Sequence, residues 1–336
     1  MKSYRIAIVG ALGAVGQEML KILDQRKFPF ETIKLLDIPS NAGTMVPFGN
    51  DYLIVEAAKK GAFSNVDIAL FSAGGDASQE LAPIAINEGA IVIDNSSAWR
   101  MDPTVPLVVP EVNPEDVDWH KGLIANPNCS TIQMLVALKP IHDIFQIQRV
   151  VVSTYQAVSG TGQKAIDELR QQAECYVTGK DIIPQVYPYQ IGFNALPHID
   201  VFQENGYTKE EMKMVNETKK ILDNNVQVSA TTVRIPVFRG HSESANIETK
   251  KAFDMDEIYT ILRNAPGIQV IDDPGNHVYP LPILAEGKDD VFVGRIRKDF
   301  TIENGLNLWI VSDNLRKGAA LNAVQIAETL IQRSLI

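Results

Sequence analysis

A cysteine stands at residue 129, between a polar segment and the start of a helical pattern. The segment Asn126-Pro127-Asn128-Cys129-Ser130-Thr131 follows a short apolar run, Leu123–Ala125. This order predicts that Cys129 lies at or near a helix N-terminus, where the positive end of the helix dipole stabilises a nucleophilic thiolate. Backbone amides at the same place could hold a developing oxyanion. The sequence therefore predicts a nucleophilic cysteine, and the alternative is a buried, inert thiol.

A nucleophilic cysteine needs an acid or a base nearby, and the chain has five histidines. His241 stands out because Arg234 and Arg239 precede it, beside an apolar strand-like run. Arginine guanidinium groups bind carboxylates through paired hydrogen bonds. The cluster therefore predicts a proton-transferring histidine beside an anion site, and the alternative is a histidine satisfied in the core or at the surface.

Two cysteines are too few for a disulfide framework. The second, Cys175, lies on a helical pattern, and we expect it to pack rather than to react. No set of Cys, His, Asp and Glu has the spacing of metal ligands, so no metal site is predicted.

Three glycines, at positions 10, 13 and 16, lie between an apolar strand and a helical pattern. Gly10 allows a tight turn, Gly13 allows backbone amides to approach a pyrophosphate, and Gly16 allows close packing of helix on strand. The motif predicts a dinucleotide site, and the alternative is a tight turn without a ligand. The residues expected to contact the cofactor here are Gly10, Leu12, Gly13, Ala14, Val15 and Gly16.

The second strand ends at Asp37 and is followed by Ser40-Asn41-Ala42-Gly43-Thr44. A carboxylate at this place accepts a hydrogen bond from the ribose 2′-hydroxyl and repels a 2′-phosphate, which favours NAD over NADP. We therefore add Asp37, Ser40 and Asn41 to the expected cofactor contacts. The alternative for Asp37 is a turn residue that faces solvent.

The elements that must position these residues alternate between strands and helices in the first part of the chain. This alternation predicts a mostly parallel, doubly wound α/β sheet covered on both faces. The predicted helices are Ala14–Gln25 and Gln79–Asn87. The predicted strands are Tyr4–Val9, Thr32–Asp37, Leu53–Ala57, Asp67–Phe71, Ala90–Asp94 and Leu123–Ala125.

After Cys129 the patterns predict a second, mixed or antiparallel sheet with helices. Pro184–Pro197 is rich in proline and predicts an ordered loop. The last helix, Lys317–Leu335, is amphipathic and is expected to return to the first domain. The other predicted helices are Ser130–His142, Gln163–Tyr176 and Lys209–Leu222. The predicted strands are Arg149–Tyr155, Val226–Phe238, Ser244–Thr249, Ile268–Ile271, Asp290–Arg297 and Leu306–Val311.

The 336 residues suggest two domains, and 45% hydrophobic with 21% charged residues is typical of a globular protein. A net charge of −10 argues against binding to nucleic acid. No apolar stretch is long enough for a membrane span, and the first residues lack a signal-peptide pattern. We therefore expect a cytoplasmic protein with reduced thiols.

Six motifs, which occur in order along nearly the whole chain, closely resemble the aspartate-semialdehyde dehydrogenase family. They are Gly10–Gly16, Asp94-Asn-Ser-Ser-Ala-Trp-Arg100, Asn126-Pro-Asn-Cys129-Ser-Thr, Tyr155-Gln-Ala-Val-Ser-Gly160, Arg234 to His241, and Asp313-Asn-Leu-Arg-Lys-Gly-Ala-Ala320. The resemblance implies a Rossmann-type domain over residues 1–127 and about 315–336. It also implies an α+β catalytic and dimerisation domain over residues 128–314.

The resemblance also implies a reaction, the reversible NADPH-dependent conversion of L-aspartyl 4-phosphate to L-aspartate 4-semialdehyde. This step belongs to lysine, threonine, methionine and diaminopimelate biosynthesis. Cys129 would form the acyl thioester, His241 would be the acid and base, and Gln156 would help to hold the thioester. The family works as a homodimer or a dimer of dimers.

The family's binding residues carry over to matching positions of this chain. Arg234 looks like the residue that pairs with the substrate carboxylate. The phosphate-binding set looks like Arg100, Asn128 and Lys213. The further cofactor-contacting positions look like Ser159, Gly160 and Asn314.

One segment departs from the family pattern. Its members usually carry Arg-Ser-Ala-Gly and a basic residue after the second strand, and that arginine pairs with the 2′-phosphate of NADP. Here Ser40 stands in place of the arginine, and Thr44 in place of the basic residue. We therefore expect NADP(H) as the cofactor, with NAD(H) accepted as well.

Three other functions compete with this interpretation. N-acetyl-glutamyl-phosphate reductase shares the chemistry, but its cysteine normally follows Asn-Pro-Gly and precedes Tyr, whereas Cys129 follows Asn128 and precedes Ser130. A related acyl-CoA reductase would not need the full phosphate-binding set. A non-catalytic dinucleotide sensor would have lost the nucleophile or its acid and base partner.

Overall fold

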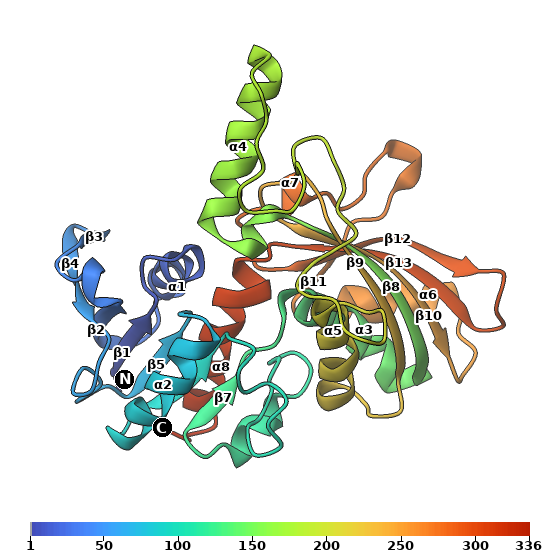
Figure 1. Ribbon diagram of the computed structural model, residues 1–336. Helices are drawn as coiled ribbons and strands as arrows, with labels where there is room; N and C mark the ends of the chain where they lie inside the picture. Colours follow the sequence, from blue (N-terminus) through green and yellow to red (C-terminus); the bar gives the residue numbers. More distant parts are fainter. Residues whose placement is uncertain (1) are drawn as a thin grey trace. The chain divides into compact units, whose positions relative to one another are not determined.

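The computed structural model describes residues 2–336, which form two compact units (Figure 1). The first unit runs up to Asn128 and resumes over Ala319–Ile336, and the second is Cys129–Gly318. Each unit has its own sheet and its own helices. No helix in the part of the chain that the structure describes is long and apolar enough to cross a membrane.

The first unit contains a seven-stranded sheet in the order β3-β4-β2-β1-β5-β6-β7. Only β3 and β4 pair antiparallel, and the other neighbours are parallel. The chain winds outward from β1 in both directions, which is the strand order of a Rossmann-like dinucleotide-binding domain. The strands are β1 Tyr4–Val9, β2 Phe30–Asp37, β3 Met45–Phe48, β4 Asp51–Ala57, β5 Ile68–Phe71, β6 Ile91–Asp94 and β7 Leu123–Ala125.

Three helices cover this sheet: α1 Ala14–Gln25, α2 Gly75–Asn87 and α8 Leu321–Gln332. The last of them begins later than expected. A π-helical turn, Arg316–Ala320, precedes α8, and most residues of α8 are buried. Its apolar residues join the same core as those of α1 and β1, so this helix is an internal part of the first unit.

The turn from β1 to α1 depends on two close approaches of backbone. Gly10 has a φ of 80°, and a Cβ atom there would lie 2.4 Å from the carbonyl oxygen of Ser72. A Cβ atom on Gly16 would lie 2.3 Å from the carbonyl oxygen of Gly10. Both positions therefore require glycine, as the spacing of the motif predicts.

The second unit contains a six-stranded mixed sheet in the order β11-β12-β13-β10-β8-β9. β8 pairs parallel with β9 and β11 with β12, whereas β10 is antiparallel to both of its neighbours. The strands are β8 Ile147–Gln156, β9 Gln227–Arg234, β10 His241–Thr249, β11 Ile268–Val270, β12 Val291–Asp299 and β13 Gly305–Ser312.

The longest helix of the second unit, α3 (Cys129–Phe145), packs on β8, β10, β12 and β13. Its core residues include Ile132, Leu135 and Leu138, which are fully buried. Two further helices, α5 (Lys209–Ile221) and α6 (Met255–Asn264), both contact α3. At the two edges of the sheet, α5 also contacts β9 and α6 contacts β11. The remaining helices are α4 Gln163–Thr178 and α7 Pro282–Ala285.

Most expected elements are present within a few residues, and the differences have physical causes. β3 was not expected because Pro47 weakens its pattern, yet proline is tolerated on this edge strand. β9 ends at Arg234 rather than at residue 238, because Pro236 cannot continue the ladder. α6 was also missed, although its capping box of Asp254 and Glu257 is a helix-start signal.

Two glycines of the first unit provide a matched test of close packing. Gly16→Ala should destabilise the protein by about 1–3 kcal/mol, because its Cβ atom would meet the backbone of Gly10. Gly75→Ala, at the start of α2, has no atom within 4 Å of its Cβ and should be neutral or slightly stabilising. Denaturant unfolding of both variants measures the difference, and equal effects would show that the turn tolerates a side chain.

Candidate active site

Four neighbouring strands of the second unit bring polar side chains together along one end of the sheet. His241 lies opposite Ser312, and Gln156 lies beside Arg234. The pairing of Ser242 with Tyr155 sets His241 beside Gln156 as well. Side chains directly opposite each other in a ladder share one face. We call these four residues the site row: Ser312, His241, Gln156 and Arg234. The Ser312 hydroxyl donates to the side chain of Gln133 on α3, so the row faces α3.

His241 is fully buried and has one hydrogen bond that fixes its ring. Its Nδ1 accepts from the backbone N–H of Ala157 at 3.0 Å. Burial, and then the positive charge of Arg234, hold the pKa of His241 well below its usual value. The ring is therefore neutral, and since Nδ1 is an acceptor, the proton is on Nε2. Nε2 has no hydrogen-bond partner among the described residues, so it is available to a substrate.

Arg234 is buried beside this histidine. Its Nη1 donates to the carbonyl oxygen of Ala157 at 2.6 Å, while Nε has no partner within the described chain. A Cβ atom on Gly160 would lie 3.0 Å from Nη1 of Arg234 and 3.3 Å from Nε2 of His241. Gly160 therefore leaves space directly in front of two side chains with unused donors.

Cys129 is the first residue of α3, a half-buried thiol that forms no disulfide. The loop after β13 packs against it, because a Cβ atom on Gly318 would lie 2.9 Å from the Cβ of Cys129. In the same loop Asn314 accepts from the N–H of Gly240 and donates to the Ser159 hydroxyl, both at 2.9 Å. One loop thus adjoins the thiol and binds the residue that precedes His241.

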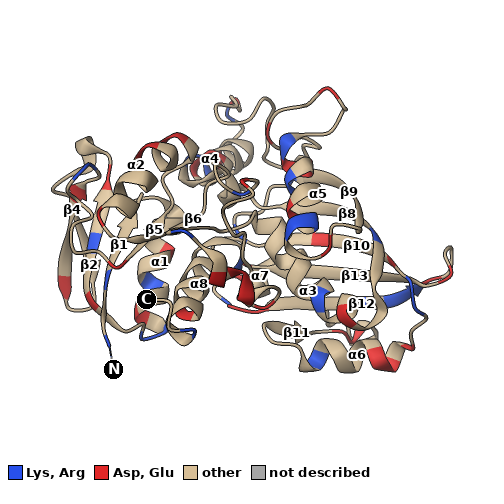
Figure 2. Cartoon of the chain, turned by 90° about the horizontal axis from the view of Figure 1, so that it is seen from below, with Lys and Arg blue, Asp and Glu red and all other residues tan. Residues whose placement is uncertain are grey.

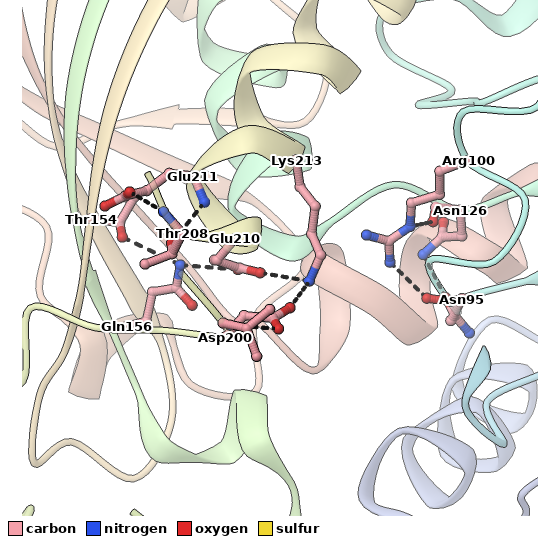
Figure 3. A network of polar contacts seen from close by, with 11 residues as sticks. Asn95, Arg100, Asn126, Thr154, Gln156, Asp200, Thr208, Glu210, Glu211 and Lys213 are labelled. Atoms are coloured by element: carbon pink, nitrogen blue, oxygen red, sulfur yellow. Dashed lines mark hydrogen bonds and ion pairs between the residues drawn. The ribbon is translucent and has the colours of Figure 1, made fainter. Parts of the chain in front are cut away.

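A chain of polar contacts connects Gln156 to α5 (Figure 3). The Gln156 amide donates to Thr154 and to Glu210, each at 3.3 Å. Lys213 Nζ donates to Glu210 at 3.0 Å and to Asp200 at 2.9 Å. Burial acts to lower the pKa of Lys213, but the two carboxylates outweigh it and raise that pKa. Lys213 is therefore a fixed cation, on a helix where basic and acidic residues alternate (Figure 2).

Sequence reasoning did not assign a role to Glu210, although it joins Gln156 to Lys213. A helical spacing of three residues puts Glu210 and Lys213 on one face of α5, and this is the signal that could have found it. A buried carboxylate beside an amide and a lysine is an acceptor suited to a cationic substrate group.

The predicted residues of the first unit lie in two places, and Arg100 is in one of them. Its Nε donates to the carbonyl oxygen of Asn126 at 2.9 Å and its Nη2 to that of Asn95 at 2.7 Å (Figure 3). The Asn126 amide in turn donates to the Asn95 side chain at 2.5 Å. These contacts hold a mostly buried guanidinium in one orientation, and Asn128 nearby in sequence is also buried.

A buried acid at the end of β6 shapes the segment that carries Arg100. Asp94 accepts from the backbone N–H and the hydroxyl of Ser96. Burial raises the pKa of the Asp94 carboxyl, and the hydrogen bonds from Ser96 and Ser78 offset only part of this effect. The indole of Trp99 donates to the same Ser78 at 2.8 Å. These bonds fix the path of the chain up to Arg100.

The other place is the glycine turn. No side chain in the described chain caps α1, so no capping group occupies the helix start where an anion would bind. Asp37 already binds this turn, because its Oδ2 accepts from the N–H of Leu12 at 3.1 Å. Its Oδ1 accepts from Ile38 and from the Asn41 amide, whereas Ser40 is exposed. Asp37 therefore supports the turn as well as lying beside it.

Two family models match the chain. The first, described as the NAD binding domain of semialdehyde dehydrogenase, covers residues 5–120. The second, described as the dimerisation domain of semialdehyde dehydrogenase, covers residues 138–317. The first unit therefore contains an NAD(P)-binding domain, and the second contains a dimerisation domain.

Relatives extend over the full length of the chain. An aspartate-semialdehyde dehydrogenase of Aquifex aeolicus is 60% identical, with 99% of both chains covered. The crystal structure of aspartate semialdehyde dehydrogenase II from Vibrio cholerae, complexed with ASA, is 47% identical with a TM-score of 0.96 over 99% of both chains. A Candida albicans enzyme solved with NADP is 25% identical with a TM-score of 0.80 over both whole chains. The chain belongs to the aspartate-semialdehyde dehydrogenase family.

Proposed function

We propose that this chain reduces L-aspartyl 4-phosphate to L-aspartate 4-semialdehyde, reversibly, through a thioester on Cys129. The observation that supports this most directly is the site row. A neutral histidine and an arginine with unused donors lie at one end of a sheet. The helix packed on that sheet begins with a half-buried cysteine that forms no disulfide.

In the first step the Cys129 thiolate attacks the acyl carbonyl, and the C–O bond to phosphate breaks. The positive end of α3 stabilises the thiolate before attack. Arg100, Asn128 and Lys213 are proposed to bind the phosphate and to stabilise its charge as it leaves. Lys213 is already positively charged before phosphate binds. Its ammonium now contacts Glu210 and Asp200, so these carboxylates would have to share it with the phosphate.

In the second step the thioester is reduced by hydride, which the nicotinamide cofactor supplies. Negative charge then develops on the carbonyl oxygen, and the Nε2–H of His241 donates a hydrogen bond to it. Collapse of the resulting thiohemiacetal breaks the C–S bond, releases the aldehyde and returns the Cys129 thiolate. In the reverse direction His241 could act as a base only in the tautomer that carries its proton on Nδ1. In that tautomer Nδ1 could no longer accept the hydrogen bond from the Ala157 N–H.

Three further side chains are proposed to orient the amino acid end of the substrate. Arg234 pairs with the α-carboxylate, for which its Nε is available. Glu210 accepts from the α-ammonium group, because it lies buried next to Gln156. Gln156 contacts the acyl group and helps to hold the thioester.

NADP(H) is the proposed cofactor, with NAD(H) accepted as well. The uncapped start of α1 and the glycine turn suit a pyrophosphate. NADP is bound in the Candida albicans relative. The absence of a basic residue at Ser40 and Thr44 supports use of NAD. The proposed contacts are Gly10, Leu12, Gly13, Ala14, Val15, Gly16, Asp37, Ser40, Asn41, Ser159, Gly160 and Asn314.

We further propose a division of labour between domains. Residues 1–127 with about 315–336 bind the dinucleotide, and residues 128–314 carry catalysis and dimerisation. The match to a dimerisation domain supports a homodimer or a dimer of dimers. A reducing cytoplasm suits an enzyme whose nucleophile is a reduced cysteine.

The thioester mechanism predicts that Cys129→Ser loses activity by at least about 10³-fold, because a hydroxyl is a far weaker nucleophile here. The assay follows phosphate-dependent reduction of NADP or NAD by absorbance, with aspartate semialdehyde as the substrate. Cys175→Ser is the matched control and should keep wild-type activity. Full activity in Cys129→Ser, or none in the folded wild type, would contradict the proposed reaction.

The lowered pKa of His241 predicts how stability depends on pH. Above about pH 6.5 the histidine is neutral whether the chain is folded or unfolded, so it adds no pH dependence. Below that value only the unfolded chain takes up the proton. Stability then falls with decreasing pH by up to about 1.4 kcal/mol per unit.

Denaturant unfolding between about pH 5 and about pH 8 measures this effect against two variants. His241→Gln should remove this contribution to the pH dependence, whereas His277→Gln, at an exposed position, should leave it intact. If both variants follow the wild type, His241 does not stay neutral in the folded protein.

The carboxylate of Asp37 predicts the choice between cofactors. Asp37→Asn keeps an oxygen that can accept from Leu12 but removes the charge that repels a 2′-phosphate. The ratio of kcat/KM for NADP to that for NAD should rise about tenfold, which corresponds to about 1.4 kcal/mol. Asp51→Asn, at the exposed first residue of β4, is the control. An unchanged ratio would mean that Asp37 only supports the turn.

A further inference from the structure

A second row of side chains crosses the same sheet, two residues along each strand from the site row and farther from the end of the sheet. Glu243 on β10 lies opposite Ile310 on β13 and Thr154 on β8, and Thr154 lies beside Thr232 on β9. All four are on the face that packs against α3, because alternate residues of a strand share a face. Glu243 is thus an acid in the middle of a sheet, two residues from His241.

Glu243 is completely buried, and neither carboxyl oxygen has a hydrogen-bond partner in the described part of the chain. Burial raises the pKa of Glu243 well above its usual value. The Gln133 amide is near enough to lower the pKa of Glu243, against the larger effect of burial. Its geometry nevertheless falls short of a hydrogen bond. The carboxyl group is therefore neutral, and it has a proton to donate.

The neighbours of Glu243 each contact a residue of the site. Gln133 is one helical turn after Cys129 on α3, and it accepts a hydrogen bond from Ser312 at 2.7 Å. Ser312 lies opposite His241. On the other side, the Thr154 hydroxyl accepts from the Gln156 amide at 3.3 Å. Glu243 thus lies between the helix of the nucleophile and the strand of Gln156, close to the site.

We propose that Glu243 is a positioning residue for catalysis: when the site is aligned, its carboxyl carbonyl oxygen accepts a hydrogen bond from the Gln133 amide on α3, and its hydroxyl donates one to the Thr154 hydroxyl oxygen on β8. The first turn of α3 and the Gln156 side chain then keep the alignment that the thioester chemistry needs. This inference rests on the proposed roles of Cys129 and Gln156.

The chemistry of the position supports a role beyond packing. Burying a carboxyl group without a hydrogen bond costs free energy, and an apolar side chain of the same volume would avoid that cost. Ala245 and Ile247, the next residues of β10 on this face, are apolar and fully buried. On this face of β10, an acid is therefore retained only at the end that adjoins the site.

The test compares two replacements of the acid in the full-length enzyme. Glu243→Met fills the same volume without hydrogen bonds, and it should lower kcat about 10²-fold with little change in KM. It should also slow the alkylation of Cys129 by iodoacetamide. Glu243→Gln keeps a neutral hydrogen-bonding group, and it should restore most of both rates. Glu248→Met, at the far end of β10, is the matched control.

Gln133→Met breaks the link from the other side and covers the case in which Glu243→Met does not fold. It should show the same fall in kcat, and combining it with Glu243→Met should add little further loss. Unchanged kcat in folded Glu243→Met or Gln133→Met would overturn the proposal, as would a Glu243→Gln enzyme as slow as Glu243→Met. An inactive wild type would instead count against the proposed function.

Discussion

The register of four strands is the constraint on which the site depends. Because side chains alternate across a sheet, a slip of one residue between β8, β9, β10 and β13 would turn His241 or Gln156 to the opposite face. The long ladder of β10 with β8 and β13 fixes this register through apolar pairs such as Ile247 with Val150. Packing far from the chemistry therefore determines which polar groups meet, and α3 then closes over that face with its N-terminal thiol.

Burial is what gives the members of the site row their chemical character. In water a histidine beside an arginine would titrate near neutral pH, whereas the buried His241 stays neutral and keeps one ring nitrogen for the Ala157 N–H. Gly160 leaves room in front of both side chains, so a substrate can reach donors that the protein itself does not use. The same burial keeps Glu243 protonated one row deeper. Low polarity around the row thus fixes the protonation states before any substrate arrives.

The sequence allowed the architecture to be predicted well, because glycine spacing and apolar runs are local signals. The glycine turn, most strands and the start of α3 at Cys129 follow from residues that are close together in the chain. Register is different, since it pairs residues such as Gln156 and Arg234 that are far apart in sequence. The three-residue spacing of Glu210 and Lys213 is a local signal, but nothing local shows that Glu210 meets Gln156 or that Glu243 meets Thr154. Asp37 was expected to meet a ribose, but its bond to Leu12 depends on how the turn folds back over β2.

The ion pairs of Lys213 set a condition on its proposed role in phosphate binding. Its ammonium already contacts two carboxylates, Glu210 and Asp200, so a phosphate bound as we propose would compete with them for the same charge. If Glu210 turns to the substrate ammonium, one of these contacts is released, and Lys213 becomes a stronger partner for the anion. Binding of the amino group and of the phosphate would then favour each other through one shared carboxylate. Such coupling would let an otherwise acidic protein favour a substrate that carries both groups over one that carries only the anion.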